Sequence, residues 1–135
     1  MNIKKILILI LLFYLNIVNA QSVTASRECP SLIDYYSQTY TYWHGLNKIL
    51  MDVKDTNERK KGISMMDDKY NEDLDKMYGI QLKREWRDAT AKTLALNLTE
   101  LMAKFIYYQA RKDVLDGKTT PINSLKREMY SLCIS

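Results

Sequence analysis

The stretch YYSQTYTYW, Tyr35 to Trp43, places five aromatic rings within nine residues and organises the expected fold. On either side of it, apolar side chains recur at spacings of three, four and seven residues, which is the period of an α-helix. Pro30 suits the first turn of that helix, because the amide hydrogen that proline lacks has no helical partner there. We therefore predict a helix from about residue 30 to about residue 53. Its first apolar stripe consists of Leu32, Tyr36, Tyr40, Trp43 and Leu50.

A second apolar stripe lies beside the first on the same helix. The two stripes together cover roughly 200° of the helix surface, which is wider than an ordinary surface helix shows. The helix can be central, with neighbours packed on two sides. Alternatively the second stripe is partly exposed and binds a partner, since tyrosine combines apolar area with a polar tip. An aromatic cage for a small molecule is the third possibility. The second stripe consists of Tyr35, Tyr42, Leu46, Ile49 and Val53.

The few glycines predict how the middle of the chain is divided. Residues 55–61 are mostly charged, and we expect a loop or a frayed helix end there. Gly62 would close the first helix or shape this loop. Ser64 would then cap a short second helix, which we expect to end at Gly79 because glycine is the commonest residue just beyond a helix.

Residues 81–116 contain neither glycine nor proline and predict one long helix, or two helices joined at a bend near Asn97. Gly117 should end this segment. Thr120 would cap the last helix, with Pro121 at its first helical position. The expected apolar stripe of the long segment consists of Leu82, Trp86, Ala89, Thr93, Leu94, Leu98, Leu101, Met102, Phe105 and Ile106.

The first 20 residues have the organisation of a secretory signal peptide. Lys4 and Lys5 precede an apolar run over residues 6–17, and small or medium residues lead to Ala20. We expect cleavage after Ala20, which leaves a single helical domain over residues 21–135 and no stable membrane insertion. This domain has 18 basic and 16 acidic residues, a net charge of +2. Because the charges are mixed along the chain, a nucleic-acid partner is not expected.

Two cysteines, Cys29 and Cys133, lie near the two ends of the expected domain. In an oxidising compartment an even number of cysteines predicts a disulfide, and two buried thiols are the alternative. A bridge across about 100 residues stabilises by at most about 4.7 kcal/mol in the chain-entropy model. The expected fold is therefore all-α, a four- to five-helix bundle closed by one terminal disulfide.

Residues that could support catalysis or metal binding are scarce. His44 is the only histidine, and we expect it to be solvated or hydrogen-bonded within the fold. The acid-rich run over residues 67–75 lacks the central glycine and the terminal glutamate of a calcium-binding loop. We expect no enzyme activity, no metal and no cofactor. The basic residues Arg59, Lys60 and Lys61 are expected to be solvated and could contact an acidic partner.

Several of these features occur together in a known layout. Cys29 opens the first helix, RKKGIS follows it at residues 59–64, Ile106-Tyr107 ends the long helix, Thr120-Pro121 opens the last one and Cys133 closes it. The layout resembles a broad group of small exported proteobacterial proteins with the pattern C…RxxGxS…IY…TP…C. The architecture is also similar to that of the helical, disulfide-bearing periplasmic immunity proteins that neutralise type VI secreted amidase effectors.

The resemblance and the residues together lead to one functional expectation. We expect an exported periplasmic protein that binds another protein, as an inhibitor or an immunity protein against a secreted toxin or a cell-wall hydrolase. Tyr35 and Tyr42 would anchor the partner, and Arg59, Lys60 and Lys61 would form a basic rim. The alternatives are a structural or stress-related envelope protein, and a small-ligand carrier. A homodimer is compatible with each of these. The carrier's pocket would be lined by Tyr36, Tyr40, Trp43 and Trp86.

Overall fold

The computed structural model of the chain describes residues 28–134. This part contains four helices and no strand: a first helix over residues 28–51, then α2 (Thr56–Lys83), α3 (Ala89–Leu115) and α4 (Ile122–Ile134). The all-α prediction is therefore confirmed. The predicted signal peptide over residues 1–20 lies outside the described residues. We call the helix over residues 28–51 the aromatic helix.

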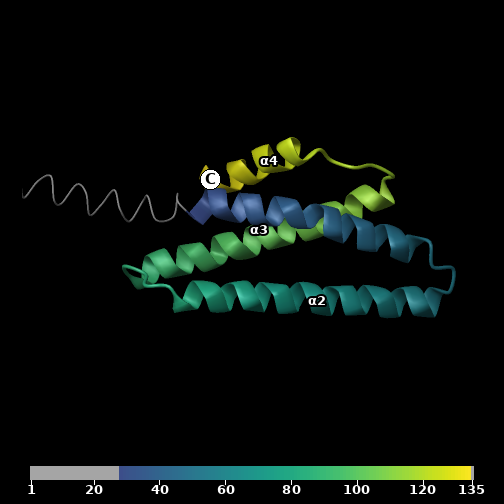
Figure 1. Ribbon diagram of the computed structural model, residues 1–135, viewed down its shortest axis with the longest axis horizontal. Helices are drawn as coiled ribbons and strands as arrows, with labels where there is room; N and C mark the ends of the chain where they lie inside the picture. Colours follow the sequence, from purple (N-terminus) through teal and green to yellow (C-terminus); the bar gives the residue numbers. More distant parts are fainter. Residues whose placement is uncertain (1–27, 135) are drawn as a thin grey trace, which may run out of the picture.

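The four helices form an elongated bundle with α2 and α4 at opposite edges (Figure 1). The aromatic helix and α3 lie between these edges, and α3 packs against both α2 and α4. The first apolar stripe of the aromatic helix faces the core, because Leu32, Tyr36, Tyr40 and Trp43 are each at most 6% exposed. This part of the sequence-based prediction agrees with the structure.

Aromatic rings join three of the helices at the centre of the core. The rings of Tyr70 from α2 and Tyr107 from α3 are stacked, with centroids 4.3 Å apart. Trp43 of the aromatic helix meets Tyr107 edge-on at 5.0 Å. Each such pair adds about 0.5–1.5 kcal/mol beyond the burial of its area. The rings near Trp43 therefore serve mainly to hold the bundle together.

The start of α2 differs from the prediction. Residues 56–61 are helical rather than a loop, and Asp55 caps α2 by accepting hydrogen bonds from Asn57 N at 2.8 Å and Glu58 N at 3.3 Å. Gly62 lies inside the helix. A Cβ atom at Gly62 would lie 2.3 Å from Leu50 Cδ2 of the aromatic helix, so this glycine allows two helices to approach closely. The glycine-based prediction of a helix end was wrong, and so were the predicted cap at Ser64 and the predicted end at Gly79.

The break between α2 and α3 also lies elsewhere than predicted. α2 continues to Lys83, residues 84–88 form the turn, and α3 then runs unbroken through Asn97. Asp88 caps α3 by accepting a hydrogen bond from Ala91 N at 2.8 Å. Neither glycine nor proline occurs in the turn, so the side chains around it must define where α2 ends.

The end of α3 was predicted correctly. Gly117 has φ of 67°, a left-handed conformation that glycine adopts without strain. Its amide donates to Val114 O, and the amide of Lys118 donates to Asp113 O, which together form a Schellman motif. The start of α4 is shifted by one residue from the prediction. The carbonyl of Pro121 accepts the hydrogen bond from Leu125 N, so Pro121 rather than Thr120 occupies the capping position.

The predicted disulfide between Cys29 and Cys133 is present in the structure, with the two Cα atoms 6.2 Å apart. It joins the start of the aromatic helix to the last turn of α4 and encloses most of the bundle. In the chain-entropy model a loop of this length gives at most about 4.7 kcal/mol. The bundle is thus closed at its termini as the sequence predicted.

Candidate protein-binding face

Three large side chains of the second stripe are exposed along the aromatic helix. Tyr35, Tyr42 and Ile49 follow one another at intervals of seven residues, which places them on one side of the helix. They are 46%, 49% and 65% exposed. We call these three residues the tyrosine face. The first stripe of the aromatic helix therefore packs in the core, whereas its second stripe is partly exposed.

Each tyrosine of this face lies against a buried ring. Tyr35 meets Tyr36 edge-on with centroids 4.9 Å apart, and Tyr42 meets Trp43 at the same distance. Buried neighbours restrict the rotation of the exposed rings. A ring that is already ordered loses less conformational entropy when a partner covers it. The two tyrosines are consequently suited to act as anchors.

A charged pair of α2 lies next to this face. Lys69 Nζ and Asp73 Oδ1 are 3.1 Å apart, one helical turn from each other. The hydrogen bond and the charge of Asp73 raise the pKa of the Lys69 ammonium. Asp73 lines the same small cavity as Tyr35, which places this pair beside the tyrosine face. The sequence did not indicate this neighbour, because it depends on how α2 packs against the aromatic helix.

The basic residues predicted as a rim have unequal roles. Arg59 Nε donates to Val53 O at 3.0 Å, and Arg59 Nη2 donates to the same carbonyl. Arg59 therefore closes the loop between the aromatic helix and α2, whereas Lys60 and Lys61 are exposed. This loop is at the Ile49 end of the tyrosine face. Tyr35 lies about 21 Å further along the helix, at 1.5 Å per residue.

A small cavity lies beneath Tyr35. It has a volume of about 20 Å³, and its lining includes Tyr36, Trp43, Tyr70 and Asp73. Among the described residues, none is hydrogen-bonded to the buried hydroxyls of Tyr36 and Tyr70. Burial raises the pKa of Tyr70 to about 12, so its hydroxyl is neutral at physiological pH. The volume suits one water molecule, which could bond to both hydroxyls.

The four rings that a ligand carrier would use are separated in the structure. Tyr36 and Trp43 line the cavity just described, which has room for a water molecule only. Tyr40 donates a hydrogen bond to Asp113 of α3. Trp86 lies in the turn after α2, where it lines an open pocket with Arg84 and other polar residues. The arrangement gives no support to a common ligand site for these rings.

A buried carboxylate joins the aromatic helix, α3 and the loop before α4. Asp113 is fully buried and accepts hydrogen bonds from Tyr40 at 2.5 Å, from the Thr120 hydroxyl at 2.5 Å and from Gln109 at 2.8 Å. Burial alone would raise the pKa of Asp113. The three hydrogen bonds and the charge of Lys118 outweigh burial and hold that pKa below its ordinary value. Asp113 is thus a structural anion.

A second carboxylate joins α2 to α3. Asp67 accepts hydrogen bonds from the Tyr107 hydroxyl and from Arg111 Nη2, the latter at 2.8 Å. The guanidinium of Arg111 also lies 4.9 Å from the centre of the Tyr107 ring. Burial opposes ionisation of Asp67, but the hydrogen bonds from Tyr107 and Arg111 lower its pKa overall. In the sequence Asp67 is only one member of the acid-rich run over residues 67–75, and nothing there indicated this network.

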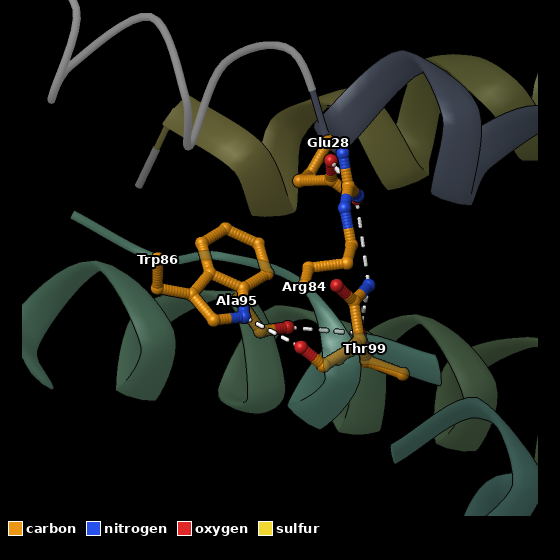
Figure 2. Close-up of polar contacts among 6 residues, drawn as sticks. Glu28, Arg84, Trp86, Ala95 and Thr99 are labelled. Atoms are coloured by element: carbon orange, nitrogen blue, oxygen red, sulfur yellow. Dashed lines mark hydrogen bonds and ion pairs between the residues drawn. The ribbon is translucent and has the colours of Figure 1, made fainter. Parts of the chain in front are cut away.

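A third polar cluster explains where α2 ends (Figure 2). Trp86 Nε1 donates to Gln81 O at 2.6 Å in the last turn of α2, and Arg84 is ion-paired with Glu28 of the aromatic helix. The Arg84 guanidinium also lies 5.4 Å from the centre of the Trp86 ring. Gln81 Nε2 lies 3.4 Å from both Glu28 Oε2 and Thr99 Oγ1. These contacts end α2 without a helix-breaking residue.

His44 lies within hydrogen-bonding distance of the loop after α3. Its Nε2 lies 3.0 Å from Lys118 O and 3.4 Å from Thr119 Oγ1, so the ring links the aromatic helix to the loop after α3. Within residues 28–134, no group of three or more metal-ligating side chains comes together. No helix in the same part of the chain is both long and apolar enough to cross a bilayer.

Comparison with known proteins adds no assignment. No protein-family model matches the sequence, and neither the curated proteins nor the solved structures show significant similarity to the chain. Function must therefore be argued from the residues and contacts described above.

Proposed function

We propose that the protein is exported to the bacterial periplasm and acts there by binding another protein through the tyrosine face. The observation that carries this proposal is the exposure of Tyr35, Tyr42 and Ile49, each close to half or more, at a regular interval on one helix. Tyrosine is enriched at the centres of protein interfaces, where it supplies area at a low entropy cost. The partner class that we favour is a secreted toxin or a cell-wall hydrolase, with this protein as its inhibitor or immunity protein.

The charges beside the face indicate how the partner would be oriented. Lys60 and Lys61 are exposed at the Ile49 end, and the pair Lys69–Asp73 lies toward the other end, where Asp73 lines a cavity with Tyr35. Exposed charges at the edge of an interface mainly raise the rate of association and its dependence on salt. We therefore expect an acidic region of the partner to lie over Lys60 and Lys61, while an apolar region covers the two tyrosines.

Two features support export. The leader sequence has the organisation of a signal peptide, and the disulfide between Cys29 and Cys133 is compatible with an oxidising compartment. Mass spectrometry of the protein recovered from its natural host tests this part. We expect a mass that lacks residues 1–20 and is two hydrogen atoms lighter than the reduced chain. A retained leader or two unmodified thiols would contradict export.

The binding role is tested by affinity capture from envelope extracts with matched variants. The wild-type protein and the Tyr35→Ser/Tyr42→Ser variant would be compared with Tyr130→Ser, since Tyr130 is 57% exposed on α4. A partner that binds the tyrosine face should be retained by Tyr130→Ser and lost with the double variant. Each anchor is expected to contribute about 2 kcal/mol, or roughly 30-fold in affinity. Equal capture by all three proteins would disprove the role of this face.

A further inference from the structure

The outward side of α3 carries a row of large apolar side chains that are about half exposed or more. Leu94, Leu101, Tyr108 and Leu115 follow one another at intervals of seven residues and are 52%, 49%, 55% and 67% exposed. We call these four residues the leucine stripe. Their spacing extends over 21 residues, or about 32 Å of helix. Monomeric proteins rarely expose large contiguous apolar patches, and such patches often mark an interaction site.

The stripe is part of a wider apolar surface. Leu98 and Phe105, which alternate with its members, are partly buried against the core. An open groove of about 410 Å³ runs along this side of α3. Its apolar lining is Leu101, Phe105, Tyr108 and Leu132 of α4, and its polar lining is Lys104, Gln109 and Lys112. The positions 94, 98, 101, 105, 108, 112 and 115 alternate in steps of four and three, as in the contact seam of a coiled coil.

We propose that the leucine stripe binds the leucine stripe of a second copy of this chain, so that two α3 helices pack antiparallel around a two-fold axis. Because the four residues are equally spaced, each of them lies opposite a member of the stripe when a second copy runs in the reverse direction. With the axis between positions 104 and 105, Leu94 of one copy faces Leu115 of the other, and Leu101 faces Tyr108. A two-fold interface requires this kind of self-complementary surface, because each residue contact occurs twice.

The charges along the stripe favour the antiparallel orientation. Lys112 is the polar residue within the seam, and the antiparallel pairing places it opposite Asn97 of the other copy. A parallel pairing would place the two Lys112 side chains against each other, which is unfavourable for like charges. Near the axis, Lys104 is paired with Glu100 of its own helix at 3.0 Å. In the dimer, the two Lys104 and the two Glu100 side chains near the axis therefore have a net charge of zero.

The dimer would not use the tyrosine face. The leucine stripe lies on α3 beside Leu132 of α4, whereas Tyr35 of the tyrosine face shares a cavity with Asp73 of α2. A dimer built on α3 therefore presents two tyrosine faces to its surroundings. It does not depend on the proposed binding of another protein and can be tested in the purified chain alone.

Sedimentation equilibrium of the oxidised protein, from low micromolar to near-millimolar concentration, tests the dimer. We expect a reversible monomer–dimer equilibrium, and we expect Leu101→Lys/Tyr108→Lys to remain monomeric over the whole range while circular dichroism shows unchanged helicity. Tyr35→Lys/Tyr42→Lys is the matched control and should dimerise like the wild-type chain. A wild-type chain that stays monomeric would overturn the proposal, and so would a dimer that survives the two lysines on α3.

Orientation is tested by chemical cross-linking. In a mixture of Leu101→Cys and Tyr108→Cys chains, a short thiol-specific linker should join position 101 of one chain to position 108 of the other. Cross-links formed mainly between two copies of the same variant would contradict the antiparallel arrangement. Because the native cysteines are bonded to each other, the introduced thiols should be the reactive ones.

Discussion

The two sides of α3 differ in the size of their side chains, because only the inward side includes a series of small residues. The inward side combines large buried side chains such as Met102, Ile106 and Tyr107 with small residues at intervals of four or seven and the fully buried Asp113. The outward side carries three leucines and a tyrosine that are about half exposed or more. Small inward residues allow helix axes to approach closely, since interaxial distance depends on the side chains at the contact. In this helix, burial therefore follows the fit between neighbouring helices as well as the hydrophobicity of single residues. The small inward residues are Ala91, Ala95, Thr99, Ala103 and Ala110.

The largest loss of stability should come from removing the buried carboxylate of Asp113 on the inward side of α3. In Asp113→Ala the hydroxyls of Tyr40 and Thr120 and the amide of Gln109 lose their acceptor. Each buried group left without a partner costs about 1–3 kcal/mol. We expect the free energy of unfolding, measured by urea denaturation, to fall by about 3–4 kcal/mol. Asp116→Ala, at an exposed position close to the end of α3, should change it by less than about 0.5 kcal/mol.

A larger side chain on the inward side should have a smaller but clear effect. Ala110 is fully buried, so Ala110→Leu forces the neighbouring helices apart. Overpacking of this kind typically costs about 1–3 kcal/mol. The expected result is a lower midpoint of thermal unfolding, measured by circular dichroism. Asn97→Leu introduces the same side chain at an exposed position of the same helix. An equal loss of stability in both variants would contradict the idea that the alanines of α3 allow its neighbours to approach closely.

Acidification should weaken the inward side through its carboxylates. The pKa values of Asp113 and Asp67 are both lowered in the folded protein by their hydrogen-bond donors, despite the opposing effect of burial. A carboxyl of this kind stabilises the fold at a pH above its unfolded pKa, about 3.9, and that stabilisation disappears as the pH falls through the folded value. We expect the unfolding midpoint to decline below about pH 4. The decline should be shallower in Asp113→Asn, and an identical profile would contradict the role of Asp113.

The smallest effect on stability is expected on the outward side. Leu101→Gln removes half-exposed apolar area and leaves no buried group without a partner, so the unfolding free energy at low protein concentration should change by less than about 0.5 kcal/mol. Urea denaturation at a concentration where the chain is monomeric measures this. A loss comparable to that of Ala110→Leu would mean that the leucine stripe belongs to the core.

Features that depend on local chemistry could be predicted from the sequence. The aromatic helix follows from the regular spacing of its rings, and Gly117 ends α3 because glycine tolerates the left-handed conformation that a Schellman motif requires. The disulfide follows from the number and position of the cysteines. The exposure of Tyr35 and Tyr42 was one of three arrangements left open, since a wide apolar surface alone does not show how much of it neighbouring helices cover.

Features that depend on contacts between distant residues could not be predicted in this way. In the sequence Gly62 suggests the end of a helix. In the structure it lies inside α2, where its missing side chain leaves room for Leu50 of the aromatic helix. The turn over residues 84–88 contains no breaker and is defined by Glu28, Gln81 and Trp86. The apolar stripe predicted for α3 is correct in part. Met102 and Ile106 are fully buried and Leu98 and Phe105 pack against the core, but Leu94 and Leu101 are about half exposed. A row of alanines at positions 91, 95, 103 and 110 was the available signal for the true inward side.

The bond between Cys29 and Cys133 also has a mechanical consequence. Tension applied to the chain outside these two residues passes through the sulfur bridge, and the helices between them carry none of it. In the oxidised protein the two attachment points stay at Cα atoms 6.2 Å apart. After reduction, the roughly 100 intervening residues could extend to about 340 Å, at 3.3 Å or more per residue. Reduction would therefore replace a short connection of fixed length between the two attachment points with a long segment that unfolds and extends under tension.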